Sequence, residues 1–66
     1  MPLPETLEGL RERIADEAPY VGSRPYSHNI IALLLRQIAN AHGQPVANQA
    51  IEDYDLEELG WSKVTT

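Results

Sequence analysis

Two histidines, His28 and His42, are the side chains in this sequence best suited to acid–base or metal chemistry. A helix containing both would hold them about 20 Å apart, so they cannot share a site within one chain. A catalytic histidine also needs a nucleophile and an orienting group within hydrogen-bond distance. Ser27 does not qualify, because neighbours on a helix do not face each other. We therefore expect no catalytic site, no metal site and no cofactor.

Five carboxylates lie within seven residues near the end of the sequence: Glu52, Asp53, Asp55, Glu57 and Glu58. They do not form a calcium loop, because the D-x-D-x-D-G spacing with a glutamate at position twelve is absent. A run of this kind is typical of a solvated face with helix caps. It would also suit docking to a basic protein, or mimicry of nucleic-acid phosphates. The sequence leaves these interpretations open.

The aromatic residues indicate a different kind of site. The sequence has three tyrosines, one tryptophan and no phenylalanine, and Tyr and Trp are enriched at protein interfaces. They would also serve to close the ends of a small core. The segment Tyr26-Ser27-His28-Asn29 places an aromatic ring among polar groups at the start of a predicted helix, where directions are fixed. We expect protein binding through Tyr26, His28 and Asn29, joined by Trp61 if the C-terminal turn folds back.

Helical periodicity positions these residues. The longest apolar run, residues 30–35, lies within a predicted helix over 27–42 that is apolar on nearly every side. Such a helix is expected at the centre of the fold, with the other elements wrapped around it. Ser27 is its expected N-cap, and Gly43 fits the left-handed position that follows a helix end. Leu34 and Ile38 are expected in the core.

Two further helices flank the central one. Leucine and isoleucine at helical spacing predict a helix over about 4–18, with Pro4 in its first turn and Pro19 ending it. Residues 19–26 form a linker with a Gly-Ser turn. A third helix over 45–54 is opened by Pro45.

The last predicted element is a short turn over 55–59. Asp55 and Glu58 match a capping box. Gly60 then ends the turn, and Trp61 falls where it can pack back on Leu56 in a Schellman motif. The fold class is therefore all-α: one small domain over residues 1–66, made of three helices and a short C-terminal helical turn.

The unit over residues 36–51 matches the DNA-binding helix-turn-helix only in part. Ala39 and Gly43 have the spacing of that motif, but Gln49 stands where a buried β-branched residue is expected. The exposed face of the second helix carries no lysine or arginine, and tracking phosphates needs several cations. Nucleic-acid binding is therefore the alternative function, not the favoured one.

Composition restricts the remaining classes of function. A 66-residue chain with net charge −5 is poorly suited to binding nucleic acid or anionic membranes. With no long apolar run and no leader pattern, we expect a soluble cytoplasmic protein. A chain this short usually needs a source of stability besides its core, such as disulfides, a metal or a partner subunit. Disulfides are excluded because it has no cysteine. We expect a homodimer that covers Ile30, Leu33 and Leu35. The expected function is an acidic, self-associating protein–protein interaction module, accessory or inhibitory and not catalytic.

Overall fold

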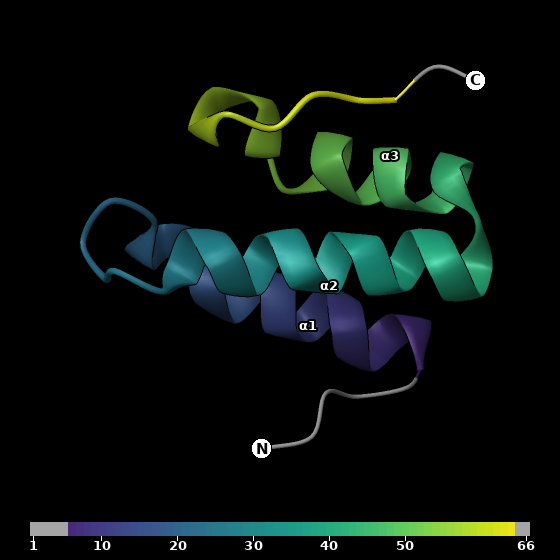
Figure 1. The fold of residues 1–66 in the computed structure, drawn as a ribbon, viewed down its shortest axis with the longest axis horizontal. Helices are drawn as coiled ribbons and strands as arrows, with labels where there is room; N and C mark the ends of the chain where they lie inside the picture. Colours follow the sequence, from purple (N-terminus) through teal and green to yellow (C-terminus); the bar gives the residue numbers. More distant parts are fainter. Residues whose placement is uncertain (1–5, 65–66) are drawn as a thin grey trace.

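The computed structural model describes residues 6–64 and shows an all-α domain (Figure 1). Its elements in chain order are α1 (Leu7–Glu17), the 3₁₀ turn η1 (Ala18–Tyr20), α2 (Ser27–His42), α3 (Gln44–Asp53) and the 3₁₀ turn η2 (Leu56–Leu59). Within the described residues there is no strand, only an isolated bridge between Val21 and Arg24. The predicted fold class is confirmed.

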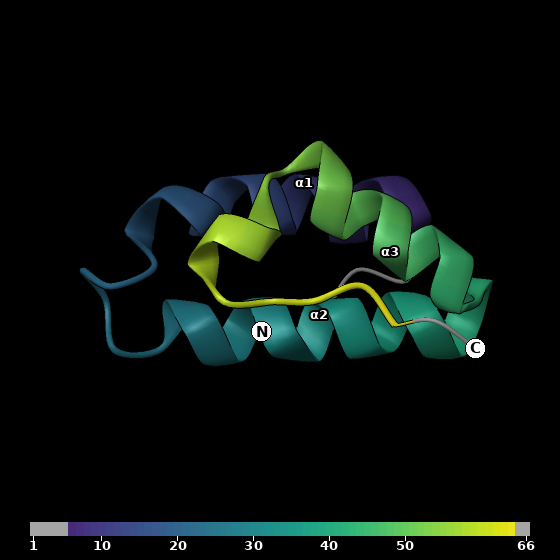
Figure 2. The same ribbon diagram turned by 90° about the horizontal axis from the view of Figure 1, so that it is seen from above.

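The helices form two layers. Figure 2 shows α2 on one side of the molecule, with α1 and α3 together on the other. The shortest Cα extent is accordingly 15 Å. The core lies between the layers and receives side chains from every α-helix and from η2: Leu10, Ile14, Ile31, Leu34, Leu35, Ile38, Ala47, Ala50, Ile51 and Leu56. Because α1 and α3 pack on the same side, α2 is central but not enclosed, and its outer face is open.

The first helix is shorter than its periodicity predicts. Thr6 is its N-cap, and the Thr6 hydroxyl oxygen accepts a hydrogen bond of 3.1 Å from the Gly9 N–H. The predicted start at Pro4 lies outside the described residues. At the other end α1 stops at Glu17, and Pro19 lies in η1. Pro19 therefore lies inside a 3₁₀ turn, at the point where the linker was predicted to begin.

Ser27 is not the N-cap of α2, so that prediction was wrong. Tyr26 occupies the cap position without a side-chain hydrogen bond, and Ser27 is the first residue of the helix. The Ser27 side chain is buried, and its hydroxyl donates to Glu17 Oε2 at 2.8 Å. Glu17 Oε1 lies 2.9 Å from Arg13 Nη1. Because the Ser27 hydroxyl donates to the buried Glu17 carboxylate, it does not cap the helix. This contact joins the end of α1 to the start of α2.

A single glycine connects α2 to α3. Gly43 has φ +100° and ψ 155°, so its φ is positive as predicted, but its ψ is extended and not left-handed helical. This conformation strongly favours glycine. Pro45 lies in the first turn of α3, as predicted, although the helix starts one residue earlier, at Gln44.

The C-terminal turn has the predicted end but not the predicted start. Asp55 is itself left-handed, at φ 54°, and makes no capping hydrogen bond, so the capping box was wrong. At the other end, the Trp61 N–H donates to Leu56 O at 3.1 Å and the Gly60 N–H donates to Glu57 O at 3.3 Å. These two bonds, with Gly60 at φ 113°, are those of a Schellman motif. They turn the chain after η2 back toward α2.

Candidate protein-binding surfaces

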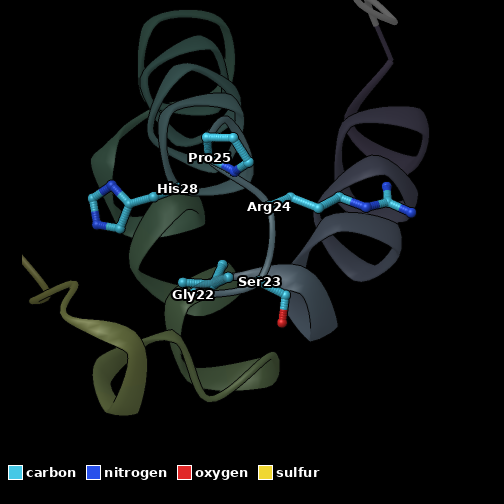
Figure 3. A pocket seen from close by; sticks show the side chains of 6 residues that line it. Gly22, Ser23, Arg24, Pro25 and His28 are labelled. Atoms are coloured by element: carbon cyan, nitrogen blue, oxygen red, sulfur yellow. The ribbon is translucent and has the colours of Figure 1, made fainter.

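The structure brings two of the four predicted binding residues into contact. The rings of His28 and Trp61 are stacked, with centroids 4.3 Å apart and an interplanar angle of 19°. His28 lies in the first turn of α2 and points toward the C-terminal segment (Figure 3). Trp61 is partly buried against the core. The predicted return of Trp61 to the start of α2 is therefore present, and the Schellman motif is what directs it there.

The other two predicted residues lie apart from that stack. Tyr26 precedes α2 and is 71% exposed, and Asn29 is exposed in the first turn. Successive helix positions differ in direction by about 100°, so His28 and Asn29 face different sides. The four residues share one end of α2 but form no single patch.

Tyr26 belongs instead to the outer face of α2. Tyr26, Ile30 and Leu33 follow the i, i+4, i+7 spacing that places side chains on one side of a helix. Leu33 is 48% exposed, Ile30 is half-buried, and Leu35 is buried in the core of the single chain. Ile30, Leu33 and Leu35 were predicted to be covered by a second copy of the chain. Of these three, Leu33 is the one that is largely exposed in the single chain.

Charge is distributed unequally between the two layers. In the described residues the acidic side chains lie on α1, on α3 and around η2: Glu8, Glu12, Asp16, Glu17, Glu52, Asp53, Asp55, Glu57 and Glu58. The sequence of α2 contains none. Its ionisable residues are Arg36 and the two histidines. The outer face of α2 is thus an acid-free surface on a protein with net charge −5.

The polar face of α3, which the alternative function would use, is engaged within the chain. Asn48 hydrogen bonds the main chain of Val64, Glu52 pairs with Lys63 at 3.2 Å, and Asp53 pairs with Arg11. These contacts link residues 11 to 42 positions apart in the sequence, so no local sequence pattern predicts them. They leave this face acidic, a poor surface for a phosphate backbone.

Asp53 is the acidic residue most clearly perturbed by its surroundings. A hydrogen bond from the Gln49 amide, at 2.8 Å, and a second from Arg11 lower the pKa of its carboxyl. Arg11 also lies over the ring of Tyr54, with its guanidinium carbon 5.5 Å from the centroid. Part of the acidic run is therefore tied to α1 and not freely solvated.

A shallow hollow lies at the loop before α2, lined by Val21, Gly22, Ser23, Arg24, Pro25 and His28 (Figure 3). The two basic side chains do not converge in it. The Arg24 guanidinium lies 3.7 Å from the centroid of the Tyr20 ring, on the opposite side of the loop from His28. Across residues 6–64, no three His, Cys, Asp or Glu side chains come together in a metal-binding group.

No protein-family model, curated protein or solved structure matches this chain. Within the described part, no helix is both long and apolar enough to cross a membrane.

Proposed function

We propose that this protein is a protein–protein interaction module that self-associates through the outer face of α2 and acts as an accessory or inhibitory component, not as an enzyme. The observation that carries the proposal is the acid-free outer face of α2, with Leu33 and Tyr26 exposed on it. Interfaces are enriched in Tyr and depleted in Asp, Glu and Lys, and this face carries Tyr26 while the α2 sequence contains none of the three depleted residue types.

A second copy fits this face on electrostatic grounds. Two chains of net charge −5 repel each other when their acidic surfaces meet. If α2 packs antiparallel on α2 of a second copy, both acidic layers point outward and the repulsion is smallest. A two-fold axis near Leu33 makes the contact isologous, with each Leu33 against the other and Asn29 facing Gln37 of the second copy.

The loop end of α2 is the proposed contact for a protein of another kind. Of the four residues around this end, Tyr26 and Asn29 lie on the self-association face, so His28 and the Trp61 ring stacked on it are the part left for such a partner. The acidic layer would then remain available for steering toward a basic partner.

Molar mass in solution tests the self-association. The wild-type chain is expected at about twice its 7.4 kDa mass by light scattering. Leu33→Glu should return it to the monomer, because a carboxylate is placed in the apolar contact. Ala15→Glu is the matched control: it adds the same charge at an exposed position on α1 and should leave the dimer intact. A monomeric wild type at millimolar concentration, or equal masses for the two variants, would contradict the proposal.

A further inference from the structure

The last described residues form a strap along the helices. The C-terminal strap, residues 61–64, runs without helical structure beside α3 and over α2 (Figures 1 and 2). It borders a slot between the two helices, whose apolar lining is Leu35, Ala39, Ala47 and Ile51. Two of these four residues are alanines, which lets a backbone approach the helices closely. The strap does not fill the slot.

One helix side chain holds the main chain of the strap. The Asn48 amide donates through Nδ2 to Val64 O at 2.7 Å and accepts through Oδ1 from the Val64 N–H at 2.9 Å. This is the paired donor and acceptor that a neighbouring strand would offer. Because only backbone atoms of Val64 take part, any residue other than proline can be held in the same way.

Two side chains of the strap add selectivity. Trp61 stacks on His28, and Lys63 Nζ lies 3.2 Å from Glu52 Oε2 and 3.8 Å from Glu57 Oε1. A peptide that takes the place of the strap would make the same contacts if it has an aromatic residue followed two positions later by a cation. The acidic run supplies the complementary charge, which gives Glu52 and Glu57 a role beyond solvation.

Beyond Trp61, which is partly buried against the core, the strap is held loosely compared with the helices. Its hydrogen bonds and ion pairs are exposed to solvent, where such contacts contribute little. Segments with few buried contacts open locally far more often than the core does.

We propose that the slot between α2 and α3 binds an extended peptide from a partner protein, with an aromatic residue followed two positions later by Lys or Arg, and that in the free chain the strap lines one side of this slot and engages Asn48 and Glu52, the groups that such a peptide would use. This site lies on the α3 side of α2 and is independent of the outer face used for self-association. Binding of the peptide would require the strap to leave.

The test measures binding of a labelled peptide to full-length variants whose strap is loosened. The probe is fluorescein-labelled Leu-Gly-Trp-Ser-Lys-Val amide, which copies residues 59–64. Val64→Pro removes the N–H that Asn48 holds, and Lys63→Glu, a second loosening variant, repels the strap from Glu52. Either loosened chain should bind the probe about tenfold more tightly than wild type does. In wild type the tethered strap competes with the probe at an effective concentration of about 1 mM.

Adding Asn48→Ala to a loosened chain should weaken probe binding about tenfold, the effect expected when main-chain hydrogen bonds are lost. A probe with Glu in place of Lys should bind no better than a scrambled peptide. Melting curves establish that each variant is folded, since Val64 and Lys63 are exposed. Absence of saturable binding to both loosened chains would overturn the proposal, and so would binding that Asn48→Ala leaves unchanged. Neither result depends on Leu33, so failure here is separate from failure of self-association.

Discussion

Glu17 and Ser27 show how single residues fix the joint between α1 and α2. Glu17 is 5% exposed and Ser27 1% exposed, and both carboxylate oxygens of Glu17 have partners. A buried carboxylate is costly unless it is paired in this way. The contact sets where the loop before α2 ends, and with it the placement of Tyr26 and His28.

Ser27→Ala is expected to destabilise the protein by about 1–3 kcal/mol, because it leaves a buried carboxylate oxygen without its donor. Ser23→Ala is the matched control, since Ser23 is exposed in the preceding loop, and it should change stability by less than about 0.5 kcal/mol. Urea denaturation compares the two. Similar losses for both variants would mean that the hydroxyl of Ser27 is not what holds this joint.

Asp53 carries a pH dependence of defined sign. Its hydrogen bonds from Gln49 and Arg11 lower the pKa of its carboxyl below the ordinary value of 3.8. The unfolded chain therefore binds this proton first on acidification. The stabilisation is complete above 3.8 and is lost as pH falls through the lower folded-state pKa.

Asp53→Asn should accordingly lose less of its melting temperature than wild type between about pH 5 and about pH 2. Asp55→Asn serves as the comparison, because Asp55 is exposed and makes no capping hydrogen bond. The measurement is the melting temperature of wild type and of both variants across this pH range. An Asp53→Asn profile parallel to that of wild type would show that its pairing does not contribute.

At the scale of elements, α2 has two faces of opposite character. Leu34 is fully buried while its neighbour Leu33 is 48% exposed. This explains why an apolar run can belong to an outer-layer helix: part of the run faces the core and part faces out. A surrounded helix and an open one carry similar patterns, and only the positions of α1 and α3 distinguish them.

Leu34→Ala should cost about 2–5 kcal/mol, the range for truncating a buried leucine. Leu33→Ala, one residue away in the same helix, should cost less than about 0.5 kcal/mol when measured on dilute, monomeric protein. Thermal and urea melts of the pair provide the measurement. Equal destabilisation would place α2 in a different rotation from the one described.

Sequence predicted the elements well and their side-chain contacts poorly. The bounds of α2 and the Schellman end at Gly60 follow from local spacing and from the conformational freedom of glycine. The partners of Ser27 and Asn48 are 10 and 16 residues away, so no local pattern could reveal them. Asp55 does not act as a cap because its backbone is left-handed, at φ 54°, whereas an N-cap residue is typically extended.

Residues 6–64 form a thin two-layer body whose acidic residues lie on one layer and around η2. Such an arrangement leaves α2 as the face on which a second copy can approach without facing like charges. The strap then covers a separate site at the side of the same helix. Self-association and peptide binding could thus operate together, since they use different sides of α2.

Oxidative cross-linking tests self-association through α2 most directly, because the chain has no cysteine of its own. In the antiparallel arrangement about a two-fold axis near Leu33, the two residues at position 33 face each other. Their Cα atoms then lie at the separation that a disulfide needs, about 4.4–6.8 Å. Leu33→Cys should form a covalent dimer quickly under mild oxidation, whereas Ala15→Cys, exposed on α1, should remain monomeric. Cross-linking at equal rates in the two variants, or none at position 33, would contradict the account.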